Sequence, residues 1–311
     1  MKVTLTKPTA GAGKWAWAGW ENALLALEHE VVPLSDETDL LINSTSSPSD
    51  ELLEWRRNNP QAKVAMNVLA WTDEDLPGLN NPGVQAAPNN VQYAHDMKSD
   101  VVFAQFTPTW REVILRKWKA EGFQLASMEM AVDDTVYQYT KPDGFEYDMT
   151  YCGGFWPYKG KNINDYLMAN LVKYRQSTYL VGKGWPIATD IDCGELELAR
   201  KYGASKVSPN VHEPHSTDGG YDVVERVFKT MYCGGLCITD PVEELESGYG
   251  FEHGTHLIIA DDPTMYGNFV DDVIQRPQDY EYIREAGRLF VKNNHTYKHR
   301  VTQLLTDLGV E

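Results

Sequence analysis

Short apolar segments alternate with amphipathic segments along the chain, and this alternation limits the folds that the chain can adopt. Residues 3–6 and 64–69 are short apolar runs rich in β-branched side chains, which are typical of buried strands. Residues 17–27 and 49–57 carry apolar side chains at helical spacing, and the second of these segments begins after an Asp/Ser cap. Strands that alternate with helices predict a parallel sheet covered by helices on both faces.

The pattern starts again after residues 142–144 (PDG), a sequence typical of a turn. We therefore predict two α/β domains, residues 1–146 and 147–311, with the last helix, residues 297–308, able to pack back on the first domain. Ligands of open α/β sheets bind beyond the carboxyl ends of the strands. The expected strands are residues 3–6, 30–34, 39–42, 64–69, 101–105, 124–128, 149–152, 178–181, 206–208, 236–239 and 255–259. The expected helices are residues 17–27, 49–57, 110–121, 162–173, 195–202, 223–232, 265–274, 280–291 and 297–308.

The composition bounds the class of protein. A chain of 311 residues with 42% apolar side chains can bury two sizeable cores. It contains no apolar run long enough to span a membrane. Because the first residues do not read as an apolar leader before a cleavage site, we expect a cytoplasmic protein. Four cysteines are too few for a disulfide framework, and Cys233 and Cys237 have no second pair that would complete a metal site, so we expect buried thiols.

The charge of the chain is strongly acidic. The 45 acidic side chains outnumber the 28 basic ones, which gives a formal net charge of −17. Binding to a nucleic-acid backbone needs Lys and Arg clustered on one face, whereas the densest basic stretches here, residues 111–119 and 292–300, resemble helical faces with apolar neighbours. The charge therefore disfavours a polyanionic partner, although it is compatible with one local basic site for a nucleotide phosphate.

A glycine-rich segment, residues 10–14 (AGAGK), follows the first expected strand but is not a P-loop. Pro8 stands where a P-loop has its first Gly, and Trp15 stands where it has Ser or Thr. Two interpretations stay open for Gly11 and Gly13. They form either a flexible turn or a backbone site for a phosphate or sugar at a helix N-terminus.

Two other short motifs suggest metal binding only weakly. Asp190-Ile191-Asp192 has the D-x-D form that suits a divalent cation on a nucleotide diphosphate, but this form arises readily by chance in so acidic a chain. Residues 212–215 (HEPH) lack the H-E-x-x-H spacing of zinc proteases. We expect no metal site.

The strongest pattern lies in the C-terminal half, where the order and spacing of five stretches are more specific than any one stretch. They are residues 147–154 (YDMTYCGG), 179–185 (YLVGKGW), 208–212 (SPNVH), 226–240 (RVFKTMYCGGLCITD) and 295–300 (HTYKHR). Through these stretches the chain resembles bacterial and phage glycosyltransferases of the spore-maturation CgeB type, within the larger group of glycosyltransferase family 4-like enzymes with the GT-B fold. The resemblance covers about half of the chain.

The resemblance implies two Rossmann-like domains that face each other across a cleft, with the donor held mainly by the C-terminal domain. Lys159 matches a loop lysine that contacts the donor diphosphate, and Arg226 matches an arginine nearby. Both are expected to be catalytic, because cations there stabilise the charge that develops on the leaving group. The other donor-binding residues that the resemblance implies are Gly153, Gly154, Trp185, Asn210, His212, Glu225, Lys229, Gly234 and Gly235.

The sequence departs from the family at two positions. Gly154 stands where relatives often have Arg, so one cation is missing. Lys229 stands where relatives usually have a glutamate that accepts hydrogen bonds from the donor ribose, and an ammonium group cannot accept one. Three explanations stay open: Glu225 or Asp222 substitutes for the glutamate, the nucleotide is held differently, or catalysis has been lost.

Three further features each have two interpretations. Gly234-Gly235 permits a close backbone approach to a ligand, but it fits a helix C-cap equally well. His95 precedes an expected strand and could act at the cleft mouth as a base or as a donor to the sugar, with a structural role as the alternative. Tryptophans such as Trp15 and Trp17 suit sugar stacking, although core packing is the default.

We therefore predict a glycosyltransferase that takes a sugar from a nucleotide-sugar co-substrate, first of all a UDP-sugar, with no other cofactor. The transfer is expected to need no metal and to retain the anomeric configuration. The acceptor, a glycan, a protein, a small molecule or a modified DNA base, is not identified. The alternatives are glycosylation of a hydroxymethylated base in DNA, a nucleotide-sugar or carbohydrate-binding protein without activity, and a metal-dependent transferase that uses Asp190 and Asp192.

Overall fold

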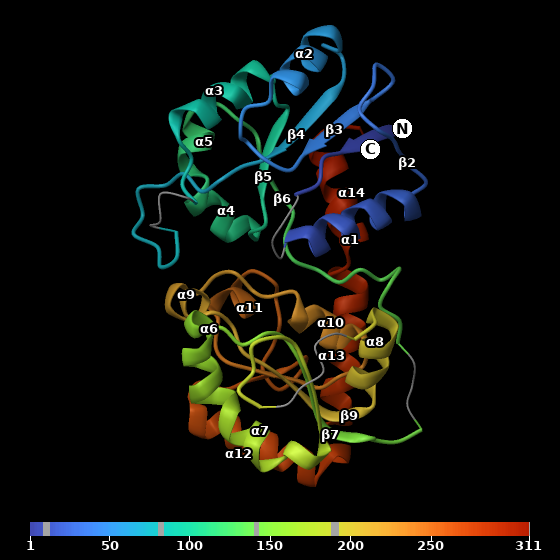
Figure 1. The fold of residues 1–311 in the computed structure, drawn as a ribbon, viewed down its shortest axis with the longest axis vertical. Helices are drawn as coiled ribbons and strands as arrows, with labels where there is room; N and C mark the ends of the chain where they lie inside the picture. Colours follow the sequence, from blue (N-terminus) through green and yellow to red (C-terminus); the bar gives the residue numbers. More distant parts are fainter. Residues whose placement is uncertain (9–12, 80–83, 140–142, 188–192, 311) are drawn as a thin grey trace. The chain divides into compact units, whose positions relative to one another are not determined.

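The protein consists of two α/β units, shown in Figure 1. The computed structural model describes residues 1–8, 13–79, 84–139, 143–187 and 193–310. The first unit comprises Met1–Asp133 and Tyr297–Glu311, and the second comprises Asp134–Thr296. Each unit has its own sheet and its own core, so each is described separately.

The first unit is built on a parallel sheet of six strands in the order β2-β1-β3-β4-β5-β6. The strands are β1 (Lys2–Leu5), β2 (Glu30–Val31), β3 (Leu40–Asn43), β4 (Lys63–Asn67), β5 (Val101–Ala104) and β6 (Leu125–Ser127). The helices are α1 (Gly13–Ala26), α2 (Asp50–Asn58), α3 (Pro88–Asp96), α4 (Pro108–Ile114), α5 (Arg116–Ala120) and α14 (Tyr297–Asp307). The side chains of β3 and β5 are buried throughout, as expected for strands that are covered on both faces.

The C-terminal helix α14 packs against α1 in the first unit. Gly19 allows this close contact, because a Cβ at position 19 would lie 2.2 Å from Cδ2 of the Tyr297 ring. Trp17 and Trp20 lie beside this contact, where their rings pack edge to face with centroids 4.4 Å apart and fill the core with Phe103. The default interpretation of Trp17 as a core residue is confirmed, whereas Trp15 is 50% exposed.

We expect Gly19→Ala to destabilise the first unit by about 2 kcal/mol, because the added methyl group overlaps the Tyr297 ring and α14 must shift. Gly144→Ala is the matched control, since a Cβ at position 144 would meet nothing within 4 Å. Urea unfolding followed by tryptophan fluorescence measures both. Equal midpoints for the two variants would contradict the proposed role of Gly19.

The second unit has a parallel sheet of five strands in the order β11-β10-β9-β7-β8. The strands are β7 (Tyr147–Cys152), β8 (Thr178–Val181), β9 (Ser205–Asn210), β10 (Cys237–Thr239) and β11 (Ile258–Ile259). The helices are α6 (Pro157–Asn162), α7 (Met168–Lys173), α8 (Glu195–Gly203), α9 (Pro214–Gly219), α10 (Arg226–Tyr232), α11 (Glu243–Ser247), α12 (Pro263–Gln275) and α13 (Glu281–Asn294). A π-helical turn, Ile163–Leu167, joins α6 to α7.

The two parallel sheets confirm the predicted α/β class. Within the described ranges, no helix combines the length and the apolar character needed to cross a membrane. Cys233 and Cys237 are buried free thiols, which confirms the interpretation of their spacing as structural, and burial raises the pKa of both.

Candidate functional site

The strand order of the second unit reverses between β7 and β9. β7 pairs with β8 on one side and with β9 on the other. The connection after β7 therefore leads to one side of the sheet, and the connection after β9 leads to the opposite side. Open α/β sheets bind ligands in the crevice beyond such a point. Cys152 ends β7 and Asn210 ends β9, and the candidate site is built on the segments that follow them.

Arg226, the first residue of α10, connects these two strand ends. Its Nε donates a hydrogen bond to the Cys152 carbonyl at 2.5 Å, and its Nη1 donates to Asn210 Oδ1 at 2.9 Å. The guanidinium carbon lies 4.5 Å from the centroid of the Tyr151 ring. Among the described residues Nη2 has no hydrogen-bond partner, and the side chain is partly exposed, so this end of the fork is available to an anion.

Lys159 supplies a second cation to the site. The expectation that Lys159 lies in a loop is wrong, because it lies in α6, which begins at Pro157. Its side chain is only 2% exposed. The Lys159 ammonium group is 3.8 Å from Glu213 Oε1 and 5.1 Å from the centroid of the Trp156 ring. Burial, reinforced by the charge of Arg226, lowers the pKa of Lys159 to about 7. This ammonium group is poorly compensated, and a bound anion would stabilise its charged form.

Glu213 is the acidic partner of this cluster. Burial raises the pKa of its carboxyl group, while the charge of Lys159 opposes that rise. Its Oε2 is buried and accepts no hydrogen bond within the described residues. A carboxylate at 3.8 Å forms only a loose ion pair with Lys159. The space around Lys159, Glu213 and Arg226 is therefore not closed by strong internal pairing.

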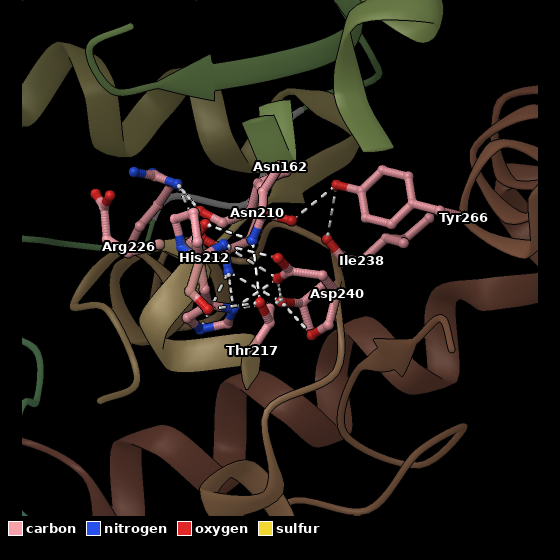
Figure 2. A network of polar contacts seen from close by, with 12 residues as sticks. Asn162, Asn210, His212, Thr217, Arg226, Ile238, Asp240 and Tyr266 are labelled. Carbon is pink, nitrogen blue, oxygen red and sulfur yellow. Dashed lines mark hydrogen bonds and ion pairs between the residues drawn. The ribbon is translucent and has the colours of Figure 1, made fainter. Parts of the chain in front are cut away.

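A buried polar network lies beneath the site and is shown in Figure 2. Asp240, which follows β10, accepts a hydrogen bond from His212 Nδ1 at 2.6 Å, and both side chains are fully buried. Asn210 Nδ2 donates a hydrogen bond to Thr239 Oγ1 at 2.9 Å, and Asn210 Oδ1 accepts one from Arg226 Nη1. Asn210 and His212, both expected at the donor site, therefore support it from below rather than line its surface.

Glycines let the backbone segments after β7 and β8 approach each other closely. A Cβ at Gly182 would lie 2.2 Å from the Gly153 carbonyl oxygen, and Gly182 has a φ of 138°, which favours glycine. A Cβ at Gly153 would lie 2.7 Å from Arg226 Nη2. Trp185 Nε1 donates to the Gly153 carbonyl at 2.8 Å and fixes the segment. Gly153 and Trp185 thus lie at the site, as does Gly154, whose Cβ would lie 3.1 Å from the Trp156 ring.

Lys229, the main departure from the family pattern, lies one turn into α10. Its ammonium group is 2.6 Å from Glu225 Oε2 and 4.8 Å from the centroid of the Tyr137 ring. Although burial opposes the change, the Glu225 carboxylate raises the pKa of Lys229. The charge of Lys229 is therefore neutralised locally. Asp222, the other candidate to replace the family glutamate, accepts a hydrogen bond from His215 Nε2 at 2.9 Å.

Several expected site residues lie elsewhere. Gly234 and Gly235 precede β10, at the amino end of the sheet, and Gly234 has a φ of 82° with its N–H bonded to the Met231 carbonyl. These features fit a helix C-cap, and this interpretation of Gly234 and Gly235 replaces the expected contact with the nucleotide-sugar donor. His95 ends α3 at the amino end of β5, where its ring packs 4.5 Å from the Phe123 ring centroid. That position supports the structural alternative for His95, not a catalytic role.

The remaining glycine and D-x-D motifs give little information about a site. Gly13 is the first residue of α1. Gly11, Asp190 and Asp192 lie outside the described residues. Across the described ranges, no group of three or more His, Cys, Asp or Glu side chains is placed to hold a metal ion.

Sequence reasoning missed two residues of the site, Glu213 and Asp240. Glu213 was considered only within the comparison of residues 212–215 with a zinc-protease motif, although it follows β9 by three positions. Asp240 follows β10 directly, at the carboxyl edge of the sheet. A position just after an expected strand could have identified both residues, because polar side chains there lie at the edge of a parallel sheet where ligands bind.

Comparisons with known proteins agree with this geometry. Residues 166–306 match the family described as "Glycosyl transferase-like". A search among curated proteins gave no match. Similar solved structures include sucrose-phosphate synthase from Thermosynechococcus elongatus, with 14% identity, 98% of this chain and 97% of that chain covered, and a TM-score of 0.60.

Two further similar structures carry a UDP-sugar. Anabaena HepE in complex with UDP-glucose is 11% identical, covers 100% of this chain and 99% of its own, and has a TM-score of 0.61. T4 phage BGT in complex with its UDP-glucose substrate is 11% identical, covers 99% of both chains and has a TM-score of 0.58. At these identities the likeness establishes the fold. The fold is GT-B.

Proposed function

We propose that this GT-B protein is a glycosyltransferase that binds a nucleotide-diphosphate sugar beyond β7 and β9 of the second unit. The observation that carries the proposal is the pair of cations, Arg226 and Lys159, at the reversal of the strand order. An arginine whose Nη2 has no hydrogen-bond partner among the residues that the structure describes, together with a poorly compensated ammonium group, suits a diphosphate. The glycosyl transferase-like family match to residues 166–306 supports the same activity.

We propose a hexose linked to UDP as the donor, which is in line with the UDP-glucose named for HepE and T4 phage BGT. The second unit would bind the donor and the first the acceptor. As in the CgeB-type enzymes that the chain resembles, the transfer would retain the anomeric configuration and need no metal. A cytoplasmic location is part of the same proposal.

Arg226 and Lys159 would stabilise the diphosphate as it leaves the sugar, because the charge on its bridging oxygen grows in the transition state. Since Lys159 is 2% exposed and its ammonium group lies 5.1 Å from the centroid of the Trp156 ring, a direct contact would require side chains around Lys159 to move. Glu225, at the N-terminus of α10, would accept the hydrogen bonds of the ribose while Lys229 holds its other oxygen. A carboxylate has enough lone pairs for both partners.

A donor screen tests the proposal. Thermal shift and nucleotide release are measured against a panel of nucleotide sugars, with and without EDTA, for the wild type and for Lys159→Ala. We expect one donor class to raise the melting temperature, and nucleotide release that EDTA leaves unchanged and that Lys159→Ala removes. Binding without release or transfer would favour the non-catalytic alternative. No binding by any nucleotide sugar would contradict the proposal, and loss of release in EDTA would contradict its metal independence.

Glycosylation of a modified DNA base is a second candidate for the reaction. The likeness to the solved structure of the DNA-modifying enzyme beta-glucosyltransferase supports it, with 10% identity and a TM-score of 0.61. The net charge of −17 weighs against it. Transfer of radiolabelled sugar to hydroxymethylcytosine-containing duplex DNA, with unmodified DNA as the control, separates this acceptor from the others.

A further inference from the structure

Asp240 makes an unusually complete set of contacts for a buried carboxylate. Its Oδ1 accepts a hydrogen bond from His212 Nδ1 at 2.6 Å. The backbone N–H of His212 also donates to the carboxylate, at 3.1 Å to Oδ1 and 3.0 Å to Oδ2. Thr239 Oγ1 adds a hydrogen bond at 3.2 Å. The side chains of Asp240 and His212 are both 0% exposed, so neither touches a ligand directly.

These contacts fix the backbone of His212 on one side, and α6 fixes it on the other. Asn162, the last residue of α6, donates from Nδ2 to the His212 carbonyl at 3.4 Å and to Thr217 Oγ1 at 3.2 Å. Figure 2 shows His212, Asp240 and Asn162 in the same polar network. The segment after β9 is therefore held between the end of β10 and α6, the helix that carries Lys159.

Both cations of the candidate site depend on this segment. Asn210 lies two positions before His212, and its Oδ1 accepts a hydrogen bond from Arg226 Nη1 at 2.9 Å. The Tyr266 hydroxyl donates to the Asn210 carbonyl at 2.8 Å and fixes it. Glu213, the position after His212, is the carboxylate nearest to Lys159, at 3.8 Å. A displacement of His212 would move the partners of Arg226 and Lys159 together.

We propose that Asp240 is a positioning residue for the donor diphosphate, acting through His212 on the partners of Arg226 and Lys159. This inference rests on the proposed function of the site. It assigns Asp240 no contact with the substrate. Its effect on binding is geometric, because Oδ1 accepts from the imidazole and both carboxylate oxygens accept from the backbone N–H of His212.

Simple electrostatics predicts the opposite effect, and this difference makes the inference testable. Asp240 is a negative charge close enough to Lys159 to act on it. If charge alone mattered, removing the carboxylate would strengthen the binding of an anion. If positioning matters, removing it would weaken binding, because an Asn at 240 that accepts from His212 Nδ1 through its Oδ1 places its NH2 group at the position of Oδ2, where it faces the backbone N–H of His212 donor against donor.

The test measures the affinity of the full-length protein for UDP by calorimetry. We expect Asp240→Asn to lower the affinity about tenfold. Glu213→Gln removes the carboxylate charge nearest to Lys159 while the contacts of His212 stay in place, so it measures the effect of charge alone, which is to raise the affinity. A double-mutant cycle adds a readout that a purely structural role would not move: Arg226→Gln should lose less affinity in the Asp240→Asn background than in the wild type.

Variants of His212 keep the inference testable if Asp240→Asn does not fold. An Asn at 212 can offer its amide N–H where Nδ1–H lies, so His212→Asn should stay within about threefold of the wild type, while His212→Leu should not. If the wild type binds UDP and Asp240→Asn binds it as well or better, only the positioning role is overturned. If the wild type does not bind UDP, the proposed function fails as well. Equal losses in His212→Asn and His212→Leu would also overturn the positioning role.

Discussion

Arg226→Gln is expected to lower kcat/KM for sugar transfer by about 10²- to 10³-fold, the usual effect of removing one preorganised charged donor from a developing anion. The guanidinium is fixed by Cys152, Asn210 and the Tyr151 ring, which leaves Nη2 to the ligand. Glutamine keeps part of the side-chain volume but loses the charge and the fork. Steady-state kinetics with the donor found in the screen measure the change.

Arg226→Lys is the matched control for charge. Lysine restores the positive charge but cannot donate to Cys152 and Asn210 while also reaching a phosphate, so we expect it to recover less than a tenth of the lost activity. Thermal unfolding of both variants distinguishes loss of the site from loss of the fold. Wild-type kinetics in Arg226→Gln, with the fold intact, would remove Arg226 from the mechanism and leave the proposed function without its main support.

The regular part of the fold follows from local patterns in the sequence. Apolar runs such as residues 101–104 become strands because only a sheet that is covered on both faces buries every side chain in the run. A side-chain cap at the start of α2 was also predicted, although the expected helix began at residue 49 and the structure has Ser49 itself as the cap, with its Oγ accepting a hydrogen bond from the Leu52 N–H. Both features depend on neighbours in the sequence, which is why they could be predicted.

The missed elements depend on packing instead. α3, α9 and α11 are short helices without a long periodic face, and α9 begins at Pro214, a residue type that suits the first position of a helix. The helix expected at residues 110–121 is interrupted at Leu115, which has a φ of −104° and ψ of 19° and separates α4 from α5. Tertiary contacts, such as that of Trp118 Nε1 with the Leu69 carbonyl, favour this break.

The site was predictable where residues match the family pattern, as Arg226 and Lys159 do, and the structure has Arg226 as the first residue of α10. It was not predictable where only a long-range contact gives a residue its role. Asp240 and His212 are 28 positions apart in the sequence, and their pairing depends on the register of β9 with β10. The role of the glycine pair at 234–235 could not be predicted, because a close backbone approach to a ligand and a helix C-cap both require glycine.

Affinity for a UDP-sugar is expected to fall as the pH rises, by about tenfold between pH 6.5 and 8.5. Burial, with the charge of Arg226, lowers the pKa of Lys159 to about 7 in the free protein, and a bound diphosphate would raise it again. Binding therefore takes up a proton above pH 7, and the affinity declines from the free pKa towards the bound one. UDP-glucose is the suitable probe, because its diphosphate has no terminal phosphate to titrate in this range.

Two variants separate Lys159 from the other groups that titrate nearby. Lys159→Met should bind more weakly at pH 6.5, with an affinity that changes little with pH. His215 is the main competing source of pH dependence, because its hydrogen bond to Asp222 raises the pKa of the imidazole although burial opposes the rise. In His215→Gln the decline should persist if Lys159 causes it. A decline that survives in Lys159→Met and disappears in His215→Gln would assign the proton to His215 and remove the titrating ammonium group from the site.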